Sequence, residues 1–288
     1  MNFSIFDVFM LVYLKELENN TDLLENLGKV VFHLDEANSD KQAKSIIKDF
    51  MLRNPIVSTD CNLEIHQETQ IFKYPSMKFI HIRQVYLQDE LTEPLKKLIK
   101  SKKSNSVYTN PDIFIELSNG KETEFFSVEL KSTKKNEIPG SSVQQINPYE
   151  WVIFIKQGKP IEITTGFYLN SITEKVQFPD RSPRPQVSFN TLKNWNKKNF
   201  ISENNSLIFK ITQSEWDNKN QLIRNWKITL VEQWLKVVLD KNLTLTSRSP
   251  WFNETLIMYT DKLLAHYEQL SKIDKEKLRD KLKSLLKD

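Results

Sequence analysis

The sequence predicts a mixed α/β or α+β fold, in which a central β-sheet is flanked by helical segments at both ends of the chain. Residues 1–100 carry apolar residues mainly at helical spacing, residues 113–169 hold four short β-branched and aromatic runs, and residues 225–287 return to helical spacing. A chain of 288 residues, 39% of them hydrophobic, is long enough and apolar enough to bury such a sheet.

The first hundred residues are expected to be mainly helical. Apolar periodicity predicts helices over 2–18, 21–34 and 40–53. Asn54-Pro55 ends the third helix, because the residue before a proline avoids the helical conformation. Residues 71–87 are rich in aromatic and β-branched residues and are predicted to be strand-like, and a short basic helix follows within 89–106.

The pattern changes after this helix, and four strands are predicted in close succession. They cover 113–117, 125–131, 150–156 and 160–169. Asn119-Gly120 indicates a turn between the first two, and Gln157-Gly158 indicates a turn between the last two. Strands so close together predict one continuous mixed or antiparallel sheet.

The rest of the chain is predicted to be loop and helix. A short helix at 189–196 and a strand at 206–212 interrupt a polar region, and helices cover 225–239 and 253–287. We interpret 1–288 as one domain, with a mainly helical part (1–100), a sheet with loops (101–215) and a helical part (216–288). Leucines near heptad spacing in the last part indicate a helix that either caps the core or forms a dimer interface.

Composition excludes several classes of functional site. One cysteine, four histidines and five glycines provide no cysteine-based zinc site, no histidine motif and no glycine-rich phosphate loop. No apolar run is long enough to span a membrane and the N-terminus lacks the features of a secretion signal, so we expect a cytoplasmic protein.

Charge is distributed unevenly along the chain. Residues 1–40 hold eight acidic residues and two lysines, a charge of −6, so with +4 overall the other 248 residues carry +10. A basic body is compatible with a polyanionic partner, although an ordinary lysine-rich surface has the same composition.

Three charged residues lie on the predicted strands at 113–117 and 125–131 or beside them. Glu129 and Lys131 share one face of a strand whose flanking residues are apolar, and Asp112 begins the preceding strand. Charges on a buried strand are costly unless they pair or bind something. If the strands pair through the Asn119-Gly120 turn, Asp112 comes close to Glu129 and Lys131. Two carboxylates supply oxygen ligands for Mg²⁺, and a lysine beside them can orient or help to deprotonate a water, or stabilise negative charge.

The same elements occur once more in the chain. Asp217-Asn218-Lys219 repeats the acid-x-lysine triplet, and a second Pro-Asp pair stands at 179–180. Both lie in polar, loop-like sequence and are far apart. Only the first combination lies on apolar strands with a separation that suits a hairpin.

The stretch "PDIFIE…SVELKS" resembles the PD-(D/E)xK nuclease motif, and its continuation over 131–156 looks like the active-site strand, recognition loop and next strand of type II restriction endonucleases. The resemblance covers about residues 107–160. It implies a central mixed sheet of the restriction-endonuclease type, in which Asp112 and Glu129 hold Mg²⁺ and Lys131 serves the nucleophilic water. The family often has a helix between its middle strands, whereas Pro139, Gly140 and Pro148 favour a recognition loop here.

The resemblance also implies an activity and partners. It implies Mg²⁺-dependent, sequence-specific hydrolysis of double-stranded DNA that leaves 5′-phosphate and 3′-hydroxyl ends. It further implies a homodimer in a prokaryotic cytoplasm, with a cognate DNA methyltransferase as a genetic rather than a physical partner. A structure-selective repair, resolvase or nicking nuclease of the same fold, or a catalytically silent DNA-binding module, are the alternatives.

Polar residues beyond Lys131 are candidates for DNA contacts. Amide and hydroxyl side chains can bond to base edges, and lysine and arginine can contact phosphates or guanine. The candidates are Lys134, Lys135, Asn136, Ser141, Ser142, Gln144, Gln145, Asn147, Arg181 and Arg184. Solvated loops would have the same composition.

A further acidic metal ligand is possible at three positions. Glu116 shares a strand face with Asp112 if the strand is regular and could then be a ligand, but we expect it to be a solvent-facing residue near the strand end. Glu25 and Glu36 in the acidic N-terminal helices are the other candidates.

Overall fold

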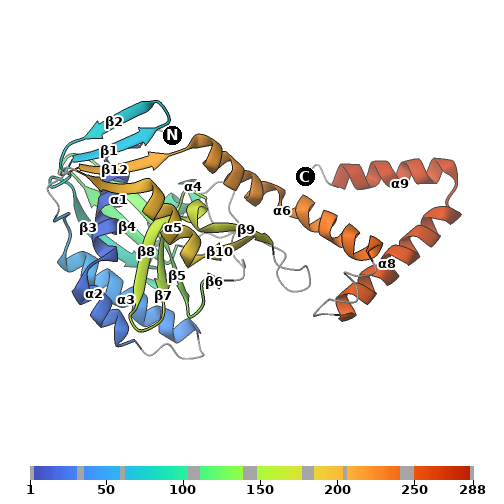
Figure 1. Cartoon of the computed structure of the whole chain (residues 1–288), viewed down its shortest axis with the longest axis horizontal. Coiled ribbons are helices and arrows are strands. Elements are labelled where there is room, and N and C mark those ends of the chain that lie inside the picture. Colours follow the sequence, from blue (N-terminus) through green and yellow to red (C-terminus); the bar gives the residue numbers. More distant parts are fainter. Residues whose placement is uncertain are drawn as a thin grey trace. The chain divides into compact units, whose positions relative to one another are not determined.

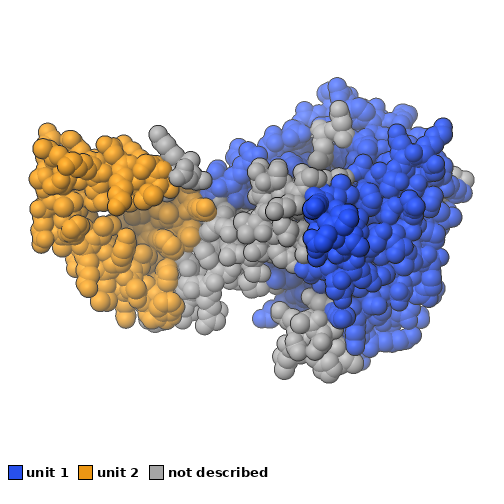
Figure 2. All heavy atoms as spheres, turned by 180° about the vertical axis from the view of Figure 1, so that it is seen from behind, with its two compact units in different colours: residues 1–177, 184–225 blue, residues 178–183, 226–288 orange. Residues whose placement is uncertain are grey.

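The computed structural model describes most of the chain as two compact units. The described residues are 3–30, 36–58, 62–102, 111–138, 148–176, 185–203, 206–240 and 250–285. Unit 1 comprises residues 1–177 and 184–225, and unit 2 comprises residues 178–183 and 226–288 (Figure 2). The single domain expected over 1–288 is thus divided into two units.

Unit 1 holds all the strands and most of the helices (Figure 1). Its helices are α1 (Ile5–Glu18), α2 (Thr21–Gly28), α3 (Glu36–Arg53), α4 (Glu93–Lys102), α5 (Phe189–Asn199) and the first part of α6 (Gln213–Leu239), with short 3₁₀ helices η1 (Gln88–Glu90) and η2 (Tyr168–Ser171). Its strands are β1 (Asn62–Gln67), β2 (Gln70–Tyr74), β3 (His81–Leu87), β4 (Ile113–Ser118), β5 (Thr123–Thr133), β6 (Glu137–Ile138), β7 (Trp151–Lys156), β8 (Glu162–Phe167), β9 (Ile172–Val176), β10 (Pro185–Ser188), β11 (Phe200–Glu203) and β12 (Ser206–Ile211).

The central sheet has the order β3-β4-β5-β7-β8. All neighbours in it are antiparallel except β5 and β7, which are parallel. The four strands predicted over 113–169 therefore form one continuous mixed sheet, as expected, and β3 extends it at one edge. Between β5 and β7 the described residues hold the short strand β6 and no helix, and residues 139–147 lie outside the described part.

The β4–β5 hairpin follows from its sequence. Every residue of β4 is buried, which accounts for its nearly continuous apolar run. At the turn, Asn119 Oδ1 accepts hydrogen bonds from the backbone N–H groups of Lys121 and Glu122. Gly120 has φ +85°, a conformation that glycine adopts without steric cost. The turn predicted at Asn119-Gly120 is confirmed.

One hydrophobic core joins the N-terminal helices to the sheet. Helix α1 is predominantly apolar and buries nine of its residues, while α3 contacts β3 and α1 contacts β8. A smaller cluster of Leu91, Ile99 and Phe114 lies between α4 and the face of β4 that points away from the main core. Both faces of the central sheet are therefore covered near the start of β4.

Two further sheets were only partly anticipated. One has the order β11-β12-β1-β2, and the other has the order β6-β10-β9. Strand β12 and helix α5 were predicted, but β1 was not. The sequence "NLEIHQ" is largely polar. Strand β1 forms an antiparallel hairpin with the adjacent strand β2 and pairs in parallel with the distant strand β12, and local sequence does not reveal the second pairing.

Unit 2 is helical. It contains the last part of α6, together with α8 (Pro250–Gln269) and α9 (Lys272–Leu285), where the sequence predicted helix. Several large apolar side chains of these helices are exposed, among them Trp251 at 63% and Leu285 at 65%. No helix in the described part of the chain is both long enough and apolar enough to cross a membrane.

Gly166 in β8 has little room for a side chain. Its φ is +155°, and a methyl group there would lie 3.2 Å from Leu192 Cδ1 of α5. We expect Gly166→Ala to lower the free energy of unfolding by roughly 1–3 kcal/mol, through backbone strain and overpacking. Urea denaturation measures this change.

Gly28→Ala is the matched control, because a methyl group at Gly28 would have no neighbour within 4 Å. It should leave stability unchanged or raise it by less than about 1 kcal/mol. Equal stability of both variants would contradict the close contact between β8 and α5.

Candidate active site

The β4–β5 hairpin places Asp112 beside the middle of β5. Ile113 pairs with Val128, so Asp112, one residue earlier, lies opposite Glu129. The backbone N–H of Leu130 donates a 2.9 Å hydrogen bond to Asp112 Oδ2. The expectation that strand pairing brings Asp112 next to the Glu129–Lys131 segment is confirmed.

Glu129 and Lys131 project from the same face of β5. Val128 and Leu130 point into the main core, so the alternation of a strand places Glu129 and Lys131 on the opposite face. Lys131 Nζ donates to Glu129 Oε1 at 2.7 Å, and the two side chains are only 17% and 11% exposed. This ion pair is therefore largely removed from water, where charges are costly without partners.

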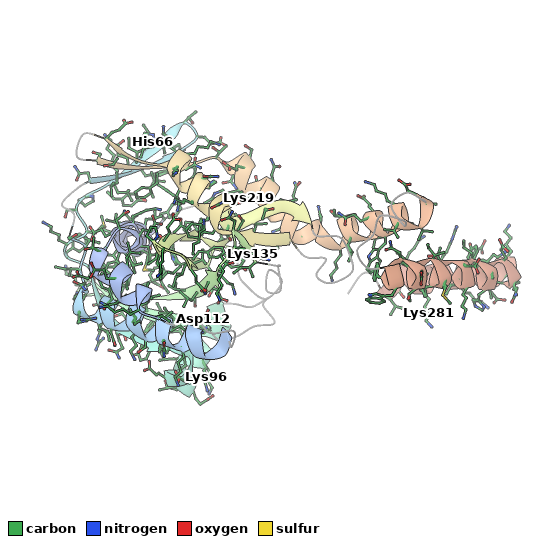
Figure 3. The ribbon with its side chains drawn as sticks, turned by 60° about the horizontal axis from the view of Figure 1, so that its bottom comes forward. His66, Lys96, Asp112, Lys135, Lys219 and Lys281 are labelled. Atoms are coloured by element: carbon green, nitrogen blue, oxygen red, sulfur yellow. The ribbon has the colours of Figure 1, made fainter. Side chains whose placement is uncertain are left out.

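Lys44 of α3 was not identified from the sequence, yet it belongs to the same cluster. Its Nζ lies 2.6 Å from Asp112 Oδ1, and its side chain is 19% exposed. Asp112 lies beside α3 in Figure 3. Both oxygens of Asp112 thus accept a hydrogen bond or ion pair, one from Leu130 and one from Lys44. No local pattern could have revealed Lys44, because α3 reaches Asp112 only through tertiary packing.

A third carboxylate, Glu150, completes the cluster. It directly precedes β7, the parallel neighbour of β5, and is 5% exposed. Its negative charge acts on Glu129. No local pattern indicated Glu150, because the parallel pairing of β7 with β5 places it: Val128 pairs with Trp151, and Glu150 immediately precedes Trp151.

Burial and neighbouring charge give Glu129 an unusual affinity for protons. Burial raises the pKa of Glu129 to about 7, with further increases from the negative charges of Asp112 and Glu150 and an opposing effect from Lys131. For Lys131, burial acts to lower the pKa, but the charges of Glu129, Tyr168 and Asp112 and the hydrogen bond to Glu129 together outweigh burial, and the net pKa is raised. Lys131 therefore stays protonated, and Glu129 is the group that takes up a proton near neutral pH.

The cluster has the chemistry of a cation site. The carboxylates of Asp112 and Glu129 are each paired with an ammonium group, and the negative charges of Asp112 and Glu150 raise the proton affinity of Glu129. Neighbouring carboxylates also favour a hard divalent cation, which prefers carboxylate oxygens. Within the described ranges no three Asp, Glu, His or Cys side chains already converge as a metal-binding group. Asp112 and Glu129 fit Mg²⁺ as a pair of ligands, with water supplying the rest.

The predicted DNA-contacting residues divide into two groups. Lys134, Lys135 and Asn136 are exposed and directly follow β5, at the end of the strand that carries Lys131. Asn136 is anchored by its backbone, since its carbonyl accepts from the N–H of Phe189 at 2.9 Å. The other candidates lie outside the described residues: Ser141, Ser142, Gln144, Gln145, Asn147, Arg181 and Arg184.

The candidate extra ligands do not join the cluster. Glu116 is 9% exposed and binds Arg83 at 3.1 Å and the Tyr86 hydroxyl at 3.3 Å, so the expectation of a solvent-facing residue is wrong. It is buried because α4 and Tyr86 cover that face of β4. Glu25 is exposed on α2, and the side chain of Glu36 lies outside the described part.

The second acid-x-lysine triplet lies on a helix. Asp217 and Lys219 belong to α6, where Asp217 accepts from Gln213 and Lys219 donates to the backbone carbonyl of Asn170. The second Pro-Asp pair, at 179–180, lies outside the described residues. The hairpin is therefore the place where a Pro-Asp pair and such a triplet are brought together in the described structure.

Comparisons with protein-family models, with curated proteins and with solved structures find no match in any of the three. The fold of the described residues is a mixed α/β arrangement with a central mixed sheet. The function therefore has to be inferred from the chemistry of the cluster itself.

The unusual pKa of Glu129 is directly measurable. Carbon NMR of protein labelled at the glutamate carboxyl carbon should show one carboxyl that titrates near pH 7. Asp112→Asn should lower this midpoint, because it removes a negative charge that raises the pKa of Glu129. The same carboxyl stabilises the fold at low pH, and this contribution is lost as the pH rises through about 7.

Glu122→Gln is the control for this titration, because Glu122 is exposed at the hairpin turn, at the far end of β5. It should leave the midpoint unchanged. A wild-type protein in which every glutamate titrates near the ordinary value of 4.5 would contradict the burial and charge arrangement described above.

Proposed function

We propose that this chain is a nuclease that hydrolyses phosphodiester bonds of double-stranded DNA with Mg²⁺, using Asp112, Glu129 and Lys131. The observation that carries the proposal is the convergence of these residues across the β4–β5 hairpin. Two carboxylates and a lysine on adjacent strands are the groups that metal-assisted phosphodiester hydrolysis needs. The resemblance of this segment to the PD-(D/E)xK motif supports the same activity.

Asp112 and Glu129 would hold the metal ion. Bound there, Mg²⁺ supplies a Lewis acid that neutralises the phosphate and lowers the pKa of a bound water. Asp112 is fixed by the N–H of Leu130, and Glu129 is fixed by its place on a buried strand. Such rigid placement keeps the ligands in position before substrate arrives.

Lys131 serves the reacting groups as a cation. Its pKa is raised by Glu129, so it remains protonated at neutral pH and does not act as a base. A protonated lysine can orient the attacking water and stabilise the negative charge that develops on the phosphoryl oxygens. In the reaction, the water oxygen bonds to phosphorus and the water releases a proton to solvent. The bond from phosphorus to the 3′ oxygen breaks, and the 3′ oxygen takes up a proton from solvent and leaves as a hydroxyl.

We further propose that the nuclease is sequence-specific and of the type II restriction class. The polar segment that follows β5 supports this, because Lys134, Lys135 and Asn136 are exposed next to the cluster. Cutting both strands would require two sites, and a homodimer provides them. A cognate methyltransferase in a prokaryotic cytoplasm completes the proposed restriction system.

Digestion of unmethylated plasmid or phage DNA tests the activity. Purified protein should give discrete fragments with Mg²⁺ and none with EDTA. Asp112→Asn, Glu129→Gln and Lys131→Met should each lower the cleavage rate by about 10²- to 10³-fold or more, because each removes charge at the reacting phosphate. Gel densitometry over time measures the rates.

Asp217→Asn is the matched control, because it alters the other acid-x-lysine triplet, on α6. It should cleave at the wild-type rate. A smear in place of fragments would favour a structure-selective or non-specific nuclease of this fold. DNA that stays intact in Mg²⁺ would contradict the proposal and favour a DNA-binding module.

Lys134 and Lys135 should contribute to DNA affinity without contributing to sequence choice. Replacing both with alanine should weaken binding and reduce the slope of log affinity against log salt concentration by about 1 to 2, because two phosphate contacts are lost. Fluorescence anisotropy with labelled duplex DNA at several salt concentrations measures this slope.

Lys121→Ala provides the comparison, because Lys121 is equally exposed but lies at the turn, at the opposite end of β5. Its salt slope should match that of the wild type. Equal slopes for all three proteins would show that DNA does not contact the segment beyond Lys131.

A further inference from the structure

The ion pair between Lys44 and Asp112 joins two elements that the proposed chemistry does not otherwise connect. Lys44 lies on α3, and Asp112 lies at the start of β4. Their 2.6 Å contact is short for an ammonium and a carboxylate, and both side chains are mostly buried, at 19% and 14% exposed. Water therefore weakens this interaction less than it weakens a surface ion pair.

The position of Lys44 differs from that of Lys131. Lys131 follows Glu129 on the same strand and binds it, so the two belong to one rigid element. Lys44 approaches Asp112 from a separate helix, at the end of a flexible four-carbon chain. Its ammonium can leave Asp112 by side-chain rotation, without movement of the backbone.

We propose that Lys44 is a positioning residue that acts as an internal counter-cation for Asp112 and competes with the divalent metal ion for that carboxylate. This inference rests on the proposed function, since it concerns the same metal site. Asp112 Oδ2 is already bonded to the N–H of Leu130, and Lys44 occupies Oδ1. A divalent cation at Asp112 must displace the ammonium or share the carboxylate with it, and two cations on one carboxylate repel each other.

The ion pair between Lys44 and Asp112 also stabilises the metal-free protein. Without Lys44, Asp112 would lose its ammonium partner beside Glu129, and buried charges without partners destabilise a fold. Lys44 therefore stabilises the site before metal binds and weakens metal binding as a consequence. Removing it should make the metal-free protein less stable and make metal binding tighter.

Manganese binding to full-length protein tests the inference without any cleavage assay. Electron paramagnetic resonance measures free Mn²⁺ during titration of the wild type, Lys44→Met and Lys44→Gln. We expect both variants to bind Mn²⁺ roughly tenfold more tightly than the wild type or more, the scale of one lost charge-assisted bond to the competing group. Thermal unfolding should show a lower melting temperature in EDTA and a larger rise on adding Mn²⁺ for the variants.

Lys48→Met is the matched control. Lys48 stands one turn further along α3, is about as buried as Lys44 and forms an ion pair with Glu90, which is 40% exposed and lies outside the cluster. Its replacement should lower stability without changing Mn²⁺ affinity. Lys44→Gln is the second variant in case Lys44→Met does not fold, because an amide can still donate a hydrogen bond to Asp112 but carries no charge.

The outcomes separate this inference from the proposed function. Tighter Mn²⁺ binding in both Lys44 variants, but not in Lys48→Met, supports the counter-cation role. Equal or weaker binding in folded Lys44 variants, with a wild type that binds Mn²⁺, overturns this inference alone. No Mn²⁺ binding to any of the proteins overturns the metal site and with it the inference.

Discussion

The hydrogen bond from the N–H of Leu130 to Asp112 Oδ2 is the interaction on which the candidate site depends. It ties the residue before β4 to the middle of β5, in a register that the Asn119-Gly120 turn sets. A slip of one residue would turn Glu129 and Lys131 into the core and Val128 and Leu130 out of it. Burial of the apolar face of β5 therefore fixes the register, and the register determines where the charged side chains lie.

Charge balance is the second constraint. The ion pairs Lys44–Asp112 and Lys131–Glu129 occupy a largely buried region, where the negative charges of Asp112 and Glu150 raise the proton affinity of Glu129. A fold selected for stability alone would replace such a cluster with apolar residues. The cluster lies at the centre of a sheet, between well-packed strands. Burying charges there lowers stability, and such a local loss of stability is common at functional sites. The proton that Glu129 takes up near neutral pH and the proposed metal ion would each neutralise negative charge at this carboxylate.

Local sequence predicted what depends on local interactions. The strands at 113–169 and the turn at Asn119-Gly120 follow from alternation, apolar runs and turn residues, and they place Asp112, Glu129 and Lys131 together. Lys44 and Glu150 could not be predicted, because they reach the cluster through packing of α3 and through the parallel β5–β7 pairing. Strand β1 was missed because its sequence is largely polar and one of its two partner strands, β12, is distant in sequence. Glu116 was misjudged because burial by α4 depends on tertiary packing.

The central claim is that Asp112 and Glu129 form one divalent-cation site across the hairpin. X-ray diffraction from crystals soaked in Mn²⁺, recorded at the manganese absorption edge, tests it most directly. The account predicts an anomalous peak within about 2.5 Å of a carboxylate oxygen from each residue, with Lys44 moved away from Asp112. No peak between these two carboxylates at millimolar Mn²⁺, with both lysine ion pairs intact, would contradict it.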